Sequence, residues 1–264
     1  MIDLICIDVD GTLVGSSGEV ADDTRAALAR TRASGVRLAI CSGRPAFGKT
    51  RGFAERLDGD GWHVFQNGAS VVHMPGGNTR SRPIDPVALR SLVTRARESG
   101  RTLELYGDTW HAVEVDEPRA RQHASLLGIP FVKRDLLDVD APVVRAQWLL
   151  PHHEVATVMA EPHDGLTLSH SLSPVMPETS FLNVTPVGVD KGEAVRTVAE
   201  AYGIPLGRVM MVGDGANDVP VMKIVGAAVA MGNAEPAARD AARHHVADVD
   251  RGGLVEALEL ALRL

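Results

Sequence analysis

Several features are scarce in this sequence. Its 264 residues include two cysteines, and aromatic residues make up 4% of the chain. No segment approaches the roughly 18 consecutive apolar residues of a membrane-spanning helix, and there is no long run of Lys or Arg. With a formal net charge of −7, the chain is poorly suited to nucleic acid or an acidic membrane surface. We therefore expect a small molecule as its partner.

Targeting and redox signals are also missing. The N-terminus has neither the basic region nor the longer apolar stretch of a secretion signal, which favours a cytoplasmic location. Cys6 and Cys41 each stand inside an apolar run rich in β-branched residues. Buried, reduced thiols are the expected state of such cysteines, and we assign them no chemistry.

What the sequence does contain, in its first and last thirds, is an alternation of short apolar runs with helical patterns. This alternation predicts a parallel sheet covered on both faces, a doubly wound α/β fold of the Rossmann-like type. The predicted strands are Leu4 to Val9, Val36 to Cys41, Trp62 to Phe65, Phe181 to Val184, Val209 to Val212 and Ala227 to Met231.

The middle of the chain has a different pattern. Helical segments there alternate with strand pairs such as Leu103 to Tyr106 and His111 to Val115, which predicts an antiparallel α+β insert. Pro-rich stretches, SRPIDP and SPVMPETS, flank it as linkers do. The predicted division is a core domain of residues 1–82 and 184–264 with an inserted domain of residues 83–183.

Two aspartates, Asp8 and Asp10, end the first apolar run in ICIDVDGTLV. In open α/β sheets ligands bind beyond the carboxyl ends of the strands, so this position fits a functional site. The following GTLVGSSG does not match the dinucleotide-binding G-x-G-x-x-G, and its glycine spacing does not match an EF-hand. Asp-Gly is also common in ordinary turns, so the dipeptide alone leaves a purely structural interpretation open.

Other predicted strand and helix ends carry polar groups as well. Ser42, Gly43 and Arg44 follow the second strand, a combination suited to holding phosphate oxygens. The loop GDGAND, residues 213–218, follows another strand and brings two further carboxylates. Lys191 opens a predicted helix, and taken alone it would be read as a solvated surface lysine.

Together, the motifs IDVDGTL, CSGR, VGVDKGEAV, VGDGANDVPVM and GAAVAMGNA resemble, in this order, those of the haloacid dehalogenase superfamily. The resemblance is closest to its Cof-type sugar-phosphate phosphatases, which carry an inserted type IIB cap. It covers both core segments, whereas no signature in the insert names a substrate. The resemblance implies a phosphatase with an α/β core and a substrate-selecting cap.

The resemblance also implies roles for single residues. Asp8 would be the nucleophile that forms an aspartyl-phosphate, and Asp10 the general acid and base. Lys191 would bridge Asp8 and the phosphoryl group. Ser42, Gly43 and Asn217 would hold the phosphoryl oxygens. For Arg44, a phosphate contact and a loop anchor remain equal alternatives.

Four carboxylates in one place require a compensating cation. The resemblance implies Mg²⁺, a hard ion that prefers oxygen ligands, bound by the Asp8 carboxylate, the Asp10 main-chain carbonyl and Asp214. Asp218 would orient the site, either from behind these ligands or through a metal-bound water. Asn67-Gly68 predicts a type I′ hairpin turn between two strands, with a substrate contact as the alternative.

The sequence thus predicts a cytoplasmic, Mg²⁺-dependent phosphatase of small phosphomonoesters, with sugar phosphates favoured by the resemblance. A phosphomutase, which uses the same core residues, is the first alternative. A phosphate-binding module without catalysis is the second. It would be expected to have lost one of Asp8, Asp10, Lys191 or Asp214, and all four are present.

Overall fold

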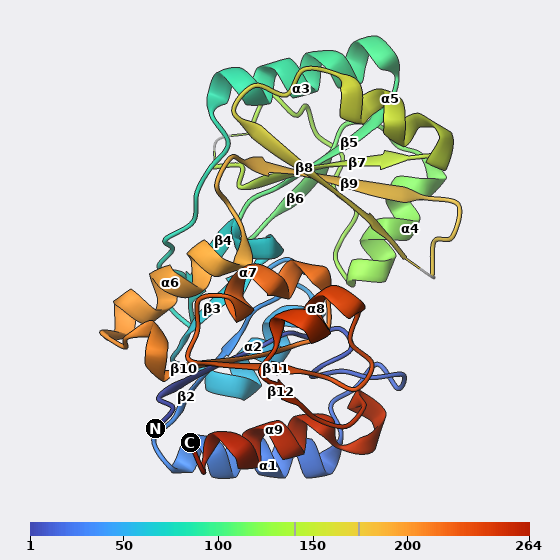
Figure 1. Cartoon of the computed structure of the whole chain (residues 1–264). Helices are drawn as coiled ribbons and strands as arrows, with labels where there is room; N and C mark the ends of the chain where they lie inside the picture. Colours follow the sequence, from blue (N-terminus) through green and yellow to red (C-terminus); the bar gives the residue numbers. More distant parts are fainter. Residues whose placement is uncertain (140, 174) are drawn as a thin grey trace. The chain divides into compact units, whose positions relative to one another are not determined.

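The computed structural model describes residues 1–139, 141–173 and 175–264. Position 174 falls within SPVMPETS, so that part of the predicted linker lies outside the described residues. The chain forms two compact units (Figure 1). The core unit comprises Met1–Arg44, Gly52–Arg80 and Asp190–Leu264, and the insert unit comprises Pro45–Arg51 and Ser81–Val189.

The core unit is built on a five-stranded sheet in the order β12-β11-β10-β1-β2, in which every neighbouring pair is parallel. Its strands are β1 (Leu4–Ile7), β2 (Arg37–Ile40), β10 (Val209–Gly213), β11 (Ala227–Ala230) and β12 (His244–His245). The predicted α/β fold is confirmed. The strand order changes direction between β1 and β10, which is where open α/β sheets bind ligands.

Helices cover both faces of this sheet. On one face α1 and α9 lie side by side, and on the other lie α6 and α7 (Figure 1). The core helices are α1 (Asp22–Ala33), α6 (Lys191–Tyr202), α7 (Val219–Met222), α8 (Pro236–Ala241) and α9 (Gly253–Ala261), together with most of α2 (Lys49–Asp58). The start of α6 is fixed by Asp190, whose side chain accepts the N–H of Glu193 at 2.9 Å. This cap places Lys191 in the first turn.

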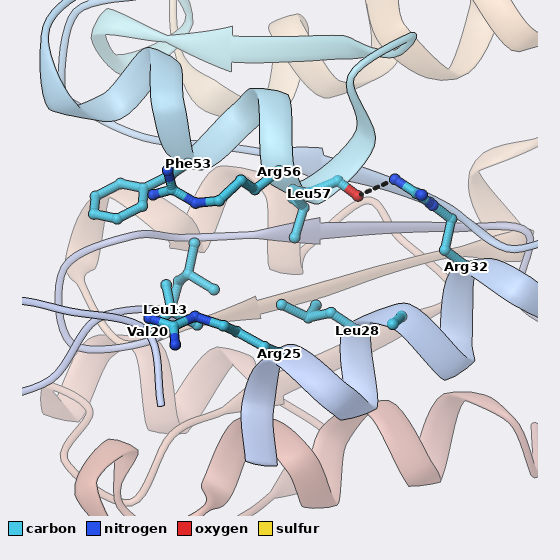
Figure 2. Close-up of a pocket in the computed structure, with 9 residues that line it drawn as sticks. Leu13, Val20, Arg25, Leu28, Arg32, Phe53, Arg56 and Leu57 are labelled. Carbon is cyan, nitrogen blue, oxygen red and sulfur yellow. Dashed lines mark hydrogen bonds between the residues drawn. The ribbon is translucent and has the colours of Figure 1, made fainter. Parts of the chain in front are cut away.

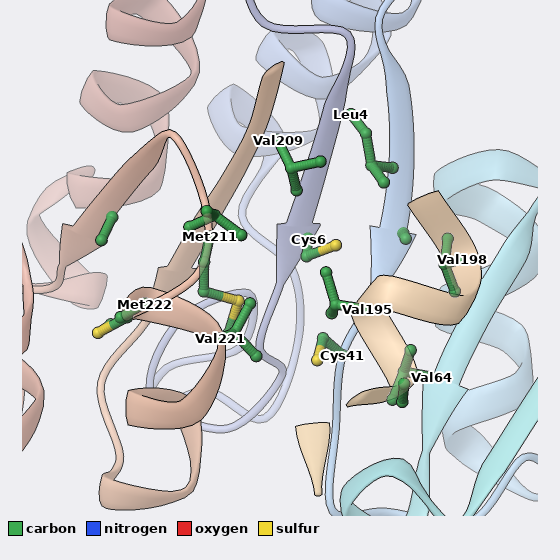
Figure 3. Close-up of a cluster of buried hydrophobic side chains, with 14 of the residues drawn as sticks. Leu4, Cys6, Cys41, Val64, Val195, Val198, Val209, Met211, Val221 and Met222 are labelled. Atoms are coloured by element: carbon green, nitrogen blue, oxygen red, sulfur yellow. The ribbon is translucent and has the colours of Figure 1, made fainter. Parts of the chain in front are cut away.

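The apolar core explains why the strands read as continuous apolar runs. All four residues of β1 are fully buried, because helices pack on both faces of the sheet. Leu4 and Cys6 lie on the face toward α6, where they pack with Val195 and Val198 (Figure 3). Burying an aliphatic side chain of this size contributes ~1.5–3 kcal/mol. Cys41 belongs to the same cluster, and both cysteines are free and buried, as predicted.

A β-hairpin lies in the chain between β2 and the main segment of the insert unit. Strands β3 (Trp62–Phe65) and β4 (Ser70–His73) pair antiparallel, and a single parallel bridge from Cys41 to Val64 joins β3 to the end of β2. The connection runs from Gln66 to Ala69, with positive φ at Gln66 as well as at Asn67 and Gly68, and the N–H of Ala69 donates to Gln66 O at 3.2 Å. These are the features of the predicted type I′ turn.

The insert unit has its own antiparallel sheet, in the order β6-β5-β7-β9-β8. One face of this sheet is apolar and packs with α3. The strands are β5 (Thr102–Tyr106), β6 (His111–Val113), β7 (Arg145–Leu150), β8 (Leu166–Leu172) and β9 (Ser180–Pro186), and the helices are α3 (Pro86–Ser99), α4 (Pro118–Leu127) and α5 (Val155–Ala160).

Two strand predictions for the core sheet were wrong. Trp62 to Phe65 forms β3 of a separate two-stranded sheet, joined to the end of β2 by a single bridge. The run Phe181 to Val184, predicted for the core sheet, lies in β9 and pairs antiparallel with β7 and β8. Leu182 and Val184 enter the apolar cluster of the insert unit, whereas Asn183 is bonded to Ser171 on the polar side. So short a run carries too little periodicity to distinguish a buried parallel strand from an antiparallel one. In the part of the chain described, no helix is long and apolar enough to span a bilayer.

Candidate active site

Three polar segments meet at one edge of the core sheet. Asp8 follows β1, Ser42 follows β2 and Asp214 follows β10. Since β1 pairs in parallel with both neighbours, the carboxyl ends of the three strands lie together. The N–H of Asp8 donates to Val212 O at 3.0 Å, which holds the start of the loop against β10. Asp8 and Ser42 are 6% and 1% exposed.

Lys191 connects the cluster. Its Nζ donates to Asp8 Oδ1 and to Asp218 Oδ1, both at 2.6 Å, and its side chain is fully buried. A solvated surface lysine, the alternative that the sequence left open, is therefore excluded. The ammonium group lies against the carboxylates of Asp8 and Asp218, which are far apart in the sequence.

Asp218 has both oxygens engaged by the protein. In addition to the Lys191 contact, Asp218 Oδ2 accepts the N–H groups of Asp214 and Gly215, each at 3.1 Å. The residue is completely buried. It therefore fixes the shape of the loop after β10 and holds the ammonium group of Lys191 in place.

Asp214 is held by two residues to which the sequence gave no role. Thr12 Oγ1 donates to Asp214 Oδ1 at 3.1 Å, and Asn233 Nδ2 donates to Asp214 Oδ2 at 3.2 Å and to Gly11 O at 2.9 Å. Both stand within the recognised motifs IDVDGTL and GAAVAMGNA, but only their contacts reveal what they do. Gly11 has φ +78°, and a Cβ there would collide with Asp214 Oδ2.

Asp10 and Arg44 form a bidentate ion pair. Arg44 Nε donates to Asp10 Oδ2 at 2.8 Å, and a terminal nitrogen donates to Oδ1 at 2.5 Å. The Asp10 side chain is 63% exposed, unlike Asp8. Arg44 is therefore the partner of Asp10 here, a contact that neither of the two predicted roles included. Solvent screening makes the pair a modest contribution to stability.

The β3–β4 turn also reaches the site. Asn217 Nδ2 donates to Asn67 Oδ1 at 3.0 Å, and Gly43 packs so closely on the Asn67 amide that a Cβ would lie 3.1 Å from its oxygen. The N–H of Asn67 donates to Ser42 O at 3.0 Å. Asn67 is thus both a turn residue and a neighbour of all three predicted phosphoryl-binding residues.

Burial and charge crowding shape the protonation of the cluster. Burial raises the pKa of Asp8 to about 8, with Lys191 acting against this and Asp218 adding to it. Burial, and then the charge of Asp218, raise the pKa of Asp214 to about 6. Burial acts to lower the pKa of Lys191, but Asp218 and Asp8 outweigh it, and the net shift is upward. The ammonium group of Lys191 therefore stays charged. Its single positive charge does not balance the negative charges of the carboxylates around it.

The donor set fits a hard divalent cation. Carboxylate oxygens of Asp8, Asp214 and Asp218 lie within 4.8 Å of one another. Asp218 accepts three hydrogen bonds from the protein, whereas each oxygen of Asp214 accepts one and Asp8 accepts one at Oδ1 from Lys191, so Asp8 and Asp214 keep more unused lone pairs for a cation. An all-oxygen set and excess negative charge suit Mg²⁺.

Comparisons with known proteins identify the family of the chain. A family model described as haloacid dehalogenase-like hydrolase matches residues 5–258. YkrA of Bacillus subtilis, provisionally named a phosphatase, is 28% identical over 260 residues, which cover 97% of this chain and 96% of YkrA.

Two solved structures show the same architecture. A haloacid dehalogenase-like hydrolase from Bacteroides thetaiotaomicron is 26% identical with a TM-score of 0.86, covering 98% of this chain and 99% of its own. The subclass IIB sugar phosphatase BT4131 has a TM-score of 0.81 at 20% identity, covering 99% of this chain and 100% of its own, a likeness that shows the fold.

Proposed function

This chain belongs to the haloacid dehalogenase-like hydrolases and is an enzyme of the phosphatase type, and we propose that it hydrolyses small phosphomonoesters through an aspartyl-phosphate on Asp8. Sugar phosphates are the proposed substrate class, supported by the resemblance of its motifs and by the sugar phosphatase among its fold neighbours. The observation that carries the proposal is the buried contact of Asp8 with Lys191 at 2.6 Å.

In the first step, a carboxylate oxygen of Asp8 attacks phosphorus as the bond from phosphorus to the leaving oxygen breaks. Asp10 gives its proton to that oxygen, so the alcohol leaves neutral. In the second step, Asp10 takes a proton from water, which attacks the aspartyl-phosphate and releases inorganic phosphate. Lys191 offsets the charge of Asp8 and of the phosphoryl group.

The ion pair of Asp10 with Arg44 conflicts with the role of Asp10 as the acid of the first step. A paired Asp10 is a carboxylate, whereas an acid must carry a proton. We propose that the phosphate dianion competes for Arg44, because guanidinium binds phosphate as readily as carboxylate. Asp10 is then released to take up a proton and turn to the leaving group. Arg44 would thus serve both as a resting partner and as a phosphate contact.

Several donors are available to the phosphoryl oxygens. Ser42 Oγ accepts the N–H of Arg44 at 3.1 Å, so its own proton is free to be donated to a substrate. The Gly43 main chain and the Asn217 amide lie beside Asn67, which we add to the proposed substrate-binding residues. Such preorganised donors stabilise the charge that shifts during phosphoryl transfer.

Mg²⁺ is the proposed cofactor, held by Asp8, Asp214 and the main-chain carbonyl of Asp10. When bound, it would neutralise the phosphoryl oxygens and orient them for in-line attack. We expect chelator to abolish activity and Mg²⁺ to restore it. Ca²⁺ should inhibit, because a larger ion would allow both oxygens of Asp8 to coordinate. Full activity in chelator would refute the metal assignment.

Residues 83–183 are proposed to select the substrate. On the polar face of the insert sheet, Arg145 Nε and Gln147 Nε2 are buried and have no partner among the described residues. Buried donors of this kind are usually satisfied, often by a ligand or by water. Arg145→Lys should therefore alter the ranking of a panel of phosphorylated metabolites, with Arg90→Lys, on the exposed surface of α3, as its control.

The panel, assayed with Mg²⁺, is the main test of the function. Release of inorganic phosphate with a dephosphorylated alcohol is the expected result. A phosphomutase would instead return the phosphoryl group to another hydroxyl of its substrate. No turnover of any phosphomonoester would refute the proposal.

A further inference from the structure

A cavity in the core unit lies between α1 and α2 and shares no residue with the carboxylate cluster (Figure 2). Its volume is about 180 Å³. Apart from the exposed Ala29 at its rim, the apolar residues that line it are each less than 9% exposed, and most of them are aliphatic. They are Leu13, Val20, Leu28, Phe53 and Leu57.

The rim of the cavity is positively charged. Three arginines and no acidic residue are among the described residues that line it, although the whole chain has a net charge of −7. Arg25 pairs with Asp22 at 2.5 Å, and Arg32 donates to Leu57 O at 3.4 Å. The guanidinium of Arg56 lies over the ring of Phe53, 5.3 Å from its centroid, with no ion-pair partner among the described residues.

We propose that this cavity binds a small carboxylate whose apolar body is about the size of one aromatic ring. An apolar protein cavity of about 150 Å³ is known to hold benzene, so the volume suits such a body. In Figure 2, Arg25 and Arg56 extend from opposite walls toward the same end of the cavity. A carboxylate at that end could accept bidentate hydrogen bonds from Arg56.

This site goes beyond the proposed phosphatase reaction, yet it adjoins the loop that carries the reacting groups. Leu13 lines the cavity, and its N–H donates to Asp8 O at 3.2 Å and Val9 O at 3.1 Å. A ligand packed on Leu13 would therefore stabilise the turn that follows Asp8. The cavity is an effector site for a carboxylate and is separate from the site of the phosphoryl group.

Benzoate is a suitable probe, because it has the required ring and charge but no phosphoryl group. We expect saturable shifts in ¹H–¹⁵N NMR spectra of the full chain, located at Leu13, Ala29 and Leu57. Benzamide, which is neutral and of similar shape, should bind at least ~10-fold more weakly, the scale of losing a hydrogen bond between charged groups. Equal binding of the two would overturn the proposal.

Two variants test the location. Arg56→Gln should weaken benzoate binding ~10-fold, whereas Arg30→Gln, on exposed α1 surface outside the cavity, should leave it unchanged. Ala29→Trp, at an exposed position of the rim, should block the cavity without altering the melting temperature. Absence of saturable shifts in the wild type, or shifts unchanged by Arg56→Gln and Ala29→Trp, would overturn the proposal.

Discussion

Each of the two units buries a carboxylate, and the two environments shift its pKa in opposite directions. In the core unit, burial raises the pKa of Asp8 to about 8. In the insert unit, burial acts to raise the pKa of Glu104, but His123 and His111 outweigh it and lower the pKa to about 2. Both residues are almost wholly inaccessible to solvent. Burial alone therefore does not decide whether a carboxylate is satisfied.

The difference lies in the partners. Asp8 shares the single ammonium of Lys191 with Asp218, and Asp214 adds a third negative charge nearby. Among the described residues, Glu104 is the one carboxylate in contact with Tyr106, His111 and His123. Its Oε2 accepts from Tyr106 at 2.6 Å and from His123 Nδ1 at 2.8 Å. Its Oε1 lies 3.3 Å from His111 Nε2, without hydrogen-bond geometry.

The positions of Asp8 and Glu104 in the fold support the same distinction between them. Glu104 stands in the middle of β5, where its partners come from the protein itself, and we interpret it as structural. Asp8 stands just beyond the end of β1 with excess negative charge around it, which an added cation would relieve. A perturbed pKa is thus a functional signal only when the protein leaves the charge uncompensated.

The largest expected effect separates the two carboxylates by activity. Asp8→Asn should lower kcat by at least ~10⁴-fold, the scale of removing a catalytic nucleophile. Glu104→Gln should keep kcat within a few-fold, because Glu104 takes no part in the proposed reaction. Steady-state assays with p-nitrophenyl phosphate at a temperature where both variants are folded provide the measurement. Comparable losses in both would refute the distinction.

The second prediction concerns Asp10, the exposed carboxylate of the core unit. Asp10→Asn should slow hydrolysis of the aspartyl-phosphate by ~10²–10⁴-fold, because water then lacks its base. A p-nitrophenolate group leaves with little help, so the first step should survive. Rapid mixing should therefore show a burst of about one product per active site, followed by a slow steady state.

Alkyl phosphates provide the control for this variant. Their alkoxide leaving groups need the proton of Asp10, so they should lose the first step as well and show no burst. Equal loss on aryl and alkyl phosphates, with no burst on either, would contradict the acid and base role of Asp10.

The positions of the candidate site residues were easier to predict from sequence than their hydrogen-bond partners. Asp8, Ser42 and Asp214 follow apolar runs, and such positions can be read from local patterns, whereas Lys191 and the proposed roles came from the resemblance of the motifs. The contact of Asn67 with Asn217 joins residues 150 positions apart, and the contact of Thr12 with Asp214 joins residues 202 apart. Separations of this length leave no trace in local periodicity.

The fold shows the same limit. Strands β1, β2, β10 and β11 could be predicted because helices bury them on both faces, which makes them continuous apolar runs, whereas β12, a pair of histidines, was not predicted. For β9, the pattern indicated a strand but could not assign it to a sheet, since partner choice depends on residues far along the chain. The pairing of Arg44 with Asp10 was missed for a similar reason, because a guanidinium can bind carboxylate or phosphate equally well.

The third prediction compares the stability of the two carboxylate variants. Glu104→Gln should lower the free energy of unfolding by ~3 kcal/mol, because two buried donors lose a charged acceptor. In a chain of this size, each kcal/mol of lost stability corresponds to a fall of roughly 2–4 °C in Tm. In chelator, Asp8→Asn should lower Tm far less or raise it, since the raised pKa of Asp8 means that the folded chain already disfavours its charged form. Thermal unfolding followed by circular dichroism measures the Tm of both variants. An equal drop in Tm would argue against the difference proposed between Asp8 and Glu104.

The last prediction follows the Glu104 contribution with pH. Its pKa is lowered from 4.5 to about 2 in the folded chain. Between these values the unfolded chain binds the proton more tightly, so the stabilisation is complete above pH 4.5 and is lost as the pH falls toward 2. The stability difference between the wild type and Glu104→Gln should therefore be ~2 kcal/mol smaller at pH 3 than at pH 6. Urea titrations at the two pH values measure this difference, and the groups common to both proteins largely cancel. A difference that stays constant with pH would show that Glu104 is not held as a charged group, and its histidine partners would then have to be reassigned.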